Sequence, residues 1–271
     1  MMLRVVFGCL IPLLVCLTAF PAWAITYVGS QAGAIAGTVT AQTITFALTG
    51  GSGSAPIADD LVVVTWCAGV AINRTLTIRN TSGADYGLIG NQLFFNDVFD
   101  GNLRVAYRVM PTPVETQVVL SELLVGGTGD VAGAGAYHIF VLRGVNATPL
   151  EQAAQQGTAI NTMLINPGSI TPTTAGTFIY VSGCAVAGSA GTYTQGDLTD
   201  FRAVGSQDNT SLNLGAGYFP WTSGIYSPAT YGGGGTDSID DSYGWTIAAF
   251  APAAGASGPP IGSLMLGGVG R

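Results

Sequence analysis

Residues 104–109 have the sequence RVAYRV, in which two kinds of side chain alternate. Successive side chains of a β-strand point to opposite faces of its sheet, so Val105, Tyr107 and Val109 share one face. The other face presents Arg104 and Arg108 to water. This period of two predicts a half-buried strand, and the same pattern recurs along much of the chain.

Residues 43–48 (TITFAL) and 74–79 (RTLTIR) alternate in the same way. Other predicted strands are more uniformly apolar, as strands inside a sandwich tend to be. These are Leu61–Cys67, Val118–Leu124, Tyr137–Leu142, Phe178–Val181 and Tyr243–Phe250. Many short strands joined by Gly-rich turns predict an all-β fold, a single antiparallel β-sandwich of jelly-roll or Greek-key type over residues 25–252.

One segment favours a helix. Leu150–Met163 (LEQAAQQGTAINTM) is rich in helix-forming residues, although Gly157 interrupts it. We expect one or two helical turns there, or a long polar loop.

Charge excludes one class of partner. The 271 residues contain eight Arg, no Lys and fifteen acidic residues. Such a chain has no basic face with which to hold a polyphosphate, so nucleic-acid binding is not expected. Only 8% of the residues are charged and 48% are hydrophobic, which is the opposite of the balance found in disordered proteins.

Residues 1–24 have the layout of a secretory signal peptide: Arg4, a long apolar run, and Ala22 and Ala24 before a cleavage site. The alternatives are a retained N-terminal anchor or a lipid on Cys16. Cleavage predicts a secreted, periplasmic or extracellular surface protein, including one on a virion surface, without membrane contact. Residues 253–271, rich in Gly, Pro and Ala, are predicted to form a flexible tail.

Cys67 and Cys184 are the cysteines that remain after cleavage. They form either a disulfide, if their Cα atoms come within about 7 Å, or two buried thiols. The segments around them, residues 60–69 and 177–185, also resemble each other, with an apolar run followed by Cys-Ala. If the fold has two equivalent halves, these segments are matching strands.

Groups suited to catalysis are few. His138 is the single histidine and lies in an apolar strand, where a structural role is expected. Two cysteines and one histidine on separate strands do not form a zinc site. No catalytic residue is therefore predicted.

Carboxylates offer an alternative function, a secreted carbohydrate-active hydrolase with Asp240 or Asp241 as one of two catalytic acids. The other acidic candidates are expected in solvated turns and polar stretches: Asp97, Asp100, Glu115, Glu122 and Glu151. No cofactor is expected, apart from one structural calcium ion for which Asp237, Asp240 and Asp241 are the candidate ligands.

Aromatic residues suggest a binding site instead. A stretch rich in Gly and Pro, read as a loop, contains Tyr218, Phe219, Trp221, Tyr226 and Tyr231. Exposed rings of this kind stack on sugars or contact proteins, with Trp221 and Tyr226 as leading contacts. The alternative is that Phe219 and Trp221 close one end of the sandwich.

Five stretches, DLVVVTWC, RVAYRVM, AYHIFVLRGV, FRAVGSQ and YGWTIAAFAP, are similar to a loose group of bacterial and phage-encoded β-sandwich proteins, several of them encoded among phage tail or virion-surface genes. The resemblance covers nearly all of residues 25–252. It implies a jelly-roll-like structural or binding module without catalytic residues. The export segment departs from the phage pattern, because virion proteins normally assemble in the cytoplasm.

Together these observations predict a non-catalytic structural or adhesion protein displayed at a cell or virion surface. Its expected partner is a cell-surface glycan, a cell-surface protein or another copy of the same chain.

Overall fold

The computed structural model describes residues 25–35, 41–70, 74–96, 99–124, 135–158, 164–186, 197–205, 212–232 and 242–254. The segment 1–24 and the tail after residue 254 lie outside the described residues. Within the described residues every regular element is a β-strand, and no helix has the length and hydropathy needed to cross a membrane.

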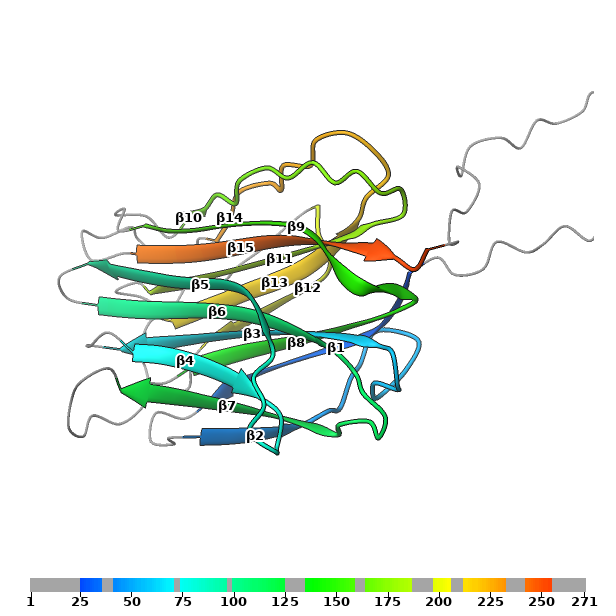
Figure 1. The fold of residues 1–271 in the computed structure, drawn as a ribbon. Helices are drawn as coiled ribbons and strands as arrows, with labels where there is room; N and C mark the ends of the chain where they lie inside the picture. The colour runs from blue at the N-terminus through cyan, green and yellow to red at the C-terminus, as the bar shows by residue number, and fades with distance from the viewer. Residues whose placement is uncertain are drawn as a thin grey trace, which may run out of the picture.

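Four sheets are present in the described part of the chain, and Figure 1 shows them stacked in layers. Sheet A, one of the two middle layers, has the strand order β1 (Thr26–Ile35), β8 (Gly135–Arg143), β3 (Leu61–Val70), β6 (Phe99–Val109) and β5 (Gly87–Asn96). Sheet B covers its outer face with β2 (Ala41–Thr45), β7 (Gln117–Leu124) and β4 (Arg74–Arg79).

Sheet C, the other middle layer, has the strand order β9 (Val145–Thr158), β15 (Ser242–Pro252), β11 (Phe178–Val186), β13 (Leu212–Pro220) and β12 (Thr199–Gly205). Sheet D lies on its outer face and consists of β10 (Leu164–Ile165) and β14 (Tyr231–Gly232). The predicted all-β, antiparallel sandwich is confirmed, and the structure stacks four layers where a single sandwich has two.

The two large sheets repeat the same topology. In sheet A the order is β1, β8, β3, β6 and β5, and in sheet C the corresponding places are taken by β9, β15, β11, β13 and β12. The strands of the two halves match in chain order once β4, an additional strand of sheet B, is left out of the count. The outer sheets agree, because β2 pairs with β7 as β10 pairs with β14. The resembling segments 60–69 and 177–185 cover all but the last residue of β3 and of β11, which are the central strands of the two sheets. The fold therefore consists of two equivalent halves.

Three hydrophobic cores separate the four layers. The central core, between sheets A and C, is built from alternate residues such as Leu61, Val63, Phe140 and Leu142. The intervening residues of the same strands, such as Val62, face sheet B in a second core. Because both faces of β3 and β8 are buried, these strands can be apolar at nearly every position.

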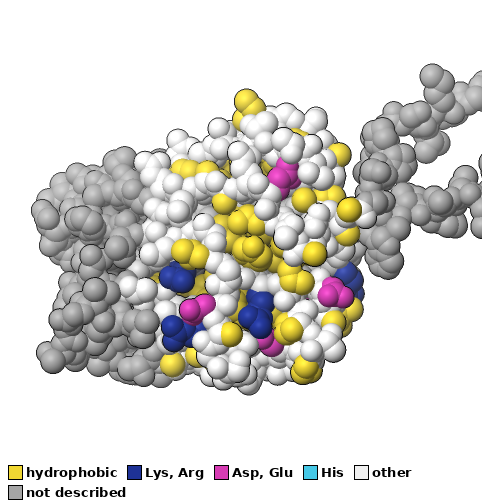
Figure 2. Space-filling view, in the orientation of Figure 1, with side chains coloured by type: hydrophobic (Ala, Val, Ile, Leu, Met, Phe, Trp, Pro, Cys, Tyr) yellow, Lys and Arg dark blue, Asp and Glu magenta, His cyan; other side chains and the backbone are white. Residues whose placement is uncertain are grey.

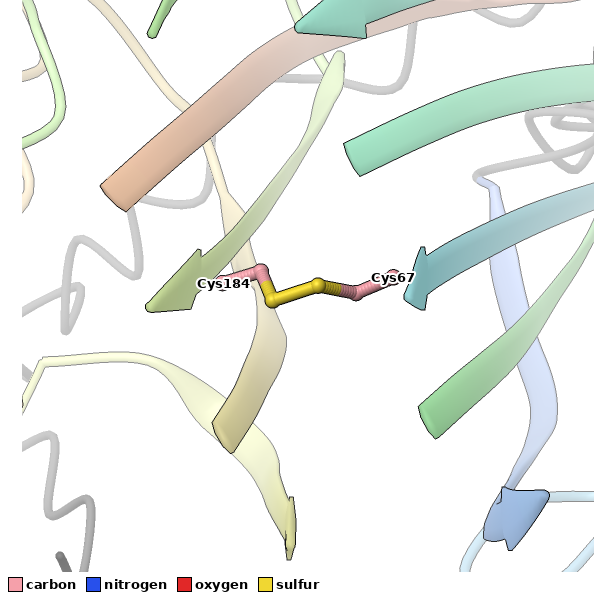
Figure 3. Close-up of a disulfide and its surroundings, with 2 residues drawn as sticks. All are labelled: Cys67 and Cys184. Carbon is pink, nitrogen blue, oxygen red and sulfur yellow. A yellow bond between two sulfur atoms is a disulfide. The ribbon is translucent and has the colours of Figure 1, made fainter. Parts of the chain in front are cut away.

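A disulfide between Cys67 and Cys184 joins the two halves across the central core (Figure 3). The Cα atoms are 6.3 Å apart, and the two cysteines are 117 residues apart in the sequence. Both side chains are fully buried. A cross-link over so long a loop restricts the unfolded chain strongly and thereby stabilises the fold.

The prediction of a helix or loop over Leu150–Met163 is wrong for the residues up to Thr158. Residues up to Thr158 belong to β9, which pairs along β15 from Val145 to Thr158. Backbone pairing with the sheet outweighs the weak helical preference of residues such as Gln155 and Ala153. Residues 159–163 lie outside the described part.

Candidate functional site

Tyr218, expected in an exposed aromatic loop, is a residue of β13 and packs in the central core. Its ring centroid lies 4.8 Å from that of Tyr27 and 5.4 Å from that of Phe178. Tyr218 is therefore one of the aromatic side chains that hold sheets A and C together.

Phe219, Trp221 and Tyr226 pack together on the outer face of sheet C. The rings of Phe219 and Tyr226 stack with centroids 4.2 Å apart, and the indole N–H of Trp221 donates a hydrogen bond to the carbonyl of Gly224 (2.9 Å). Burial raises the pKa of Tyr226, and the Asp197 carboxylate, which accepts a hydrogen bond from the Tyr226 hydroxyl (3.2 Å), raises it further.

These rings cover the outer face of sheet C, whereas the alternative interpretation placed Phe219 and Trp221 at one end of the sandwich. The strands of sheet D have two residues each, so loop side chains must provide most of the cover for the apolar outer face of sheet C. Trp221 and Tyr226 are buried and present little ring surface to a sugar. The backbone of Tyr231 pairs with Ile165, but its side chain lies outside the described part.

The candidate calcium and hydrolase residues Asp237, Asp240 and Asp241 lie outside the described residues, as does Asp97. The side chains of Asp100 and Glu122 lie outside them too. Among the residues that are described, no group of three metal-ligating side chains is close enough to hold a metal ion.

Glu151 fixes the loop that precedes β11. Its carboxylate accepts hydrogen bonds from the backbone N–H groups of Thr173 (2.5 Å) and Thr174 (3.0 Å), and from the hydroxyls of Thr173 and Thr177. Burial alone raises the pKa of Glu151, but these hydrogen bonds to its charged form outweigh burial and hold the pKa below its usual value. This carboxylate has a structural role.

Glu115 has a similar role. It pairs with Arg108 (2.8 Å) and accepts hydrogen bonds from Asn80 (2.8 Å) and from the hydroxyl of Tyr86 (3.3 Å). The guanidinium of Arg108 also lies over the Tyr86 ring, 5.7 Å from its centroid. The cluster ties the turn after β4 to the segment before β7.

His138 lies in the central core, fully surrounded by protein. Its Nδ1 atom is 2.9 Å from the hydroxyl of Tyr180, which lies 2.7 Å from the hydroxyl of Thr65. Burial lowers the pKa of His138 from 6.5 to about 3, so the ring is neutral at physiological pH. This geometry supports the structural role expected for the single histidine.

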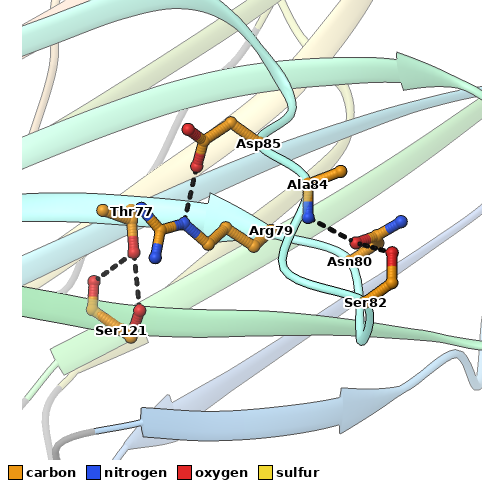
Figure 4. A network of polar contacts seen from close by, with 7 residues as sticks. All are labelled: Thr77, Arg79, Asn80, Ser82, Ala84, Asp85 and Ser121. Carbon is orange, nitrogen blue, oxygen red and sulfur yellow. Dashed lines mark hydrogen bonds and ion pairs between the residues drawn. The ribbon is translucent and has the colours of Figure 1, made fainter.

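Sequence reasoning missed a polar cluster at the edge of sheet B (Figure 4). Arg79 donates to Asp85 through Nε (2.6 Å), and the Thr77 hydroxyl lies 2.6 Å from that of Ser121. In the turn that follows β4, the side-chain oxygen of Asn80 accepts the backbone N–H of Ala84 (2.8 Å). The residues of this cluster belong to β4, to the turn after it and to β7, and no local sequence pattern shows that these segments meet.

No protein-family model, curated protein or solved structure matches this chain. The similarity to phage-encoded β-sandwich proteins therefore stays a prediction.

Replacing Trp221 by Ala should destabilise the protein by about 3–5 kcal/mol, because the change removes a large buried ring from the cover of sheet C. Ile225, in the same loop and 73% exposed, provides the control. Its replacement by Ala should change stability by no more than about 0.5 kcal/mol. Denaturant unfolding measures both. Equal stability of Trp221→Ala and the wild type would mean that the ring is a surface contact after all.

Stability should depend on pH through His138. Below pH 6.5 the unfolded chain binds a proton at this ring, whereas the folded protein does so only near pH 3, so acid favours unfolding across that window. Between pH 6.5 and 4.5 the wild type should lose about 2 kcal/mol more than His138→Gln. Unfolding curves recorded at both pH values test this. Parallel losses in the two proteins would show that the ring is already protonated in the fold.

Proposed function

We propose that this protein is a non-catalytic structural and binding protein displayed at a cell or virion surface. The main support is that most of its described carboxylates hold the scaffold together instead of standing free in a cleft. Six of them accept hydrogen bonds or pair with arginines: Asp60, Asp85, Glu115, Glu151, Asp197 and Asp200.

Asp60 and Asp200 illustrate this use of charge. Asp60 is fully buried and receives two N–H groups of Arg143, at 2.8 and 2.9 Å. Asp200, on β12, accepts hydrogen bonds from Tyr27 and Ser30 of β1 and so joins the two halves at one edge. Carboxylates bound in this way stabilise a framework and are poorly placed to exchange protons with a substrate.

The disulfide supports a location outside the cytoplasm. Disulfides form and persist in oxidising compartments, and this one links the centres of the two large sheets. It agrees with the predicted export segment at residues 1–24. A rigid, cross-linked framework of this kind suits a protein that must withstand an extracellular environment.

Attachment would use surfaces other than the aromatic cluster, whose rings are mostly buried. Among the residues that the structure describes, the large hydrophobic side chains that remain exposed are Ile57 (52%), Leu88 (51%) and Ile225 (73%). We propose a cell-surface glycan or another copy of this chain as the partner. The alternative hydrolase, using Asp240 or Asp241, has no supporting contact among the described residues.

A glycan array combined with light scattering after size exclusion tests this proposal on the exported protein. The expected result is saturable binding to at least one glycan, or a defined assembly, without release of sugar from polysaccharides. Release of sugar that disappears in Asp240→Asn would instead establish the hydrolase. A monomer that binds no glycan would contradict both forms of the proposal.

A further inference from the structure

The outer face of sheet A is only partly covered. Sheet B packs its strand β4 against β6 and β3, while β5 forms the open edge of sheet A beyond it. Leu88, on β5 opposite Ala106, is 51% exposed there. Figure 2 shows basic and acidic side chains gathered in the lower half of this view of the molecule, beneath a band of hydrophobic side chains.

Arginines are concentrated at this edge. Arg104 and Arg108 lie four positions apart on the same face of β6, and Arg79 ends the neighbouring strand β4. The chain as a whole carries a net charge of −7, so a local gathering of positive charge stands out against its acidic background. Such a gathering attracts anions.

Arg104 differs from the other arginines whose side chains are described. Each of the others has a carboxylate oxygen within 3.0 Å: Arg79 has Asp85, Arg108 has Glu115, Arg143 has Asp60 and Arg202 has Asp200. Arg104 has no such partner within the described part of the chain. Its Nε atom is buried without a hydrogen bond, as are those of Arg108 and Arg202, so the guanidinium of Arg104 meets solvent through its outer edge.

The surroundings of Arg104 leave its charge incompletely balanced. Burial lowers the pKa of Arg104; among the nearby charges, Asp85 opposes this shift and Arg79 adds to it. Asp85 already pairs with Arg79. A half-buried guanidinium without a carboxylate partner is unfavourable, and an anion from outside would supply the missing interaction.

We propose that Arg104, with Arg79 beside it, binds the carboxylate group of an acidic sugar. The inference rests on the glycan-binding form of the proposed function and names its ligand class. The outer edge of a guanidinium matches the two oxygens of a carboxylate. Asp85, with a side chain 60% exposed, can accept hydrogen bonds from sugar hydroxyls, and Leu88 can pack against the apolar face of a sugar ring.

A sugar fits this site better than a second copy of the chain. Another copy would also have to present a free carboxylate, but six of the seven carboxylates whose side chains are described are already bound within the fold. An acidic sugar brings a free carboxylate, hydroxyl donors and an apolar ring face in one small ligand, which matches the three kinds of group at this edge.

Calorimetric titration of the full chain with oligogalacturonate, and with its methyl ester as the uncharged counterpart, tests the inference. The acid should bind at least tenfold more tightly than the ester, and added salt should weaken its binding. Arg104→Gln should reduce affinity for the acid about tenfold or more. Arg104→Lys should have an affinity between those of the wild type and Arg104→Gln, because lysine keeps the charge but lacks the guanidinium group that forms two parallel hydrogen bonds with a carboxylate.

Arg202→Gln is the matched control, since it removes an arginine that is paired with Asp200 at the opposite edge of the sheets. It should leave affinity for oligogalacturonate unchanged. Circular dichroism and melting curves verify that each variant is folded. If Arg104→Gln does not fold, Arg104→Lys takes its place as the variant that tests the site.

Several results would overturn the inference. Equal binding of the acid and the ester, or unchanged binding in Arg104→Gln, would exclude a carboxylate at this arginine. Self-association lost in Arg104→Gln, without any binding of the sugar, would identify a second copy as the partner. Binding of neutral glycans alone would contradict this inference and leave the proposed function intact. If the protein binds no glycan at all, the glycan-binding form of the proposed function is wrong as well.

Discussion

The contact between sheets A and C is the constraint on which the rest of the structure depends. Both sheets bury one face in the central core, and their central strands β3 and β11 are joined there by the Cys67–Cys184 disulfide. Each sheet must then cover its outer face as well, because that face is also apolar. Sheet B does so for sheet A, whereas short strands and aromatic loop residues do so for sheet C. The four-layer arrangement follows from this requirement.

The same constraint explains where polar chemistry can lie. A polar group in the central core must be neutral and hydrogen-bonded, as His138, Tyr180 and Thr65 are. Charged groups lie outside this core, and most of the described ones are paired. Arg104 is the described arginine without a carboxylate partner, and it led to the proposed carboxylate site near the edge of sheet A. The proposal of binding near this edge, in place of catalysis in a cleft, rests on this distribution of charge.

Local patterns in the sequence predicted the strands but not their partners. Alternation at residues 104–109 correctly indicated that Val105 is buried, and the uniform apolar run at Leu61–Cys67 indicated burial on both faces. Whether Cys67 meets Cys184 depends on how two sheets stack, which no local pattern encodes. Trp221 lies in a segment that looked like an exposed loop, because the sequence does not reveal that sheet D is too small to cover its neighbour. The sequence could not show that Arg104 lacks a carboxylate partner either. Whether an arginine has such a partner depends on which strands and turns lie next to it in the fold.

Native-state hydrogen exchange as a function of denaturant tests the central claim most directly. If the two halves share one core, amides of β3 and β8 should exchange in the same cooperative unit as those of β11 and β15. The free energy of opening of this unit should be the highest in the molecule. Exchange of residues 145–252 through an opening that leaves residues 25–143 protected would contradict this account. It would show that the halves are independent sandwiches that merely touch.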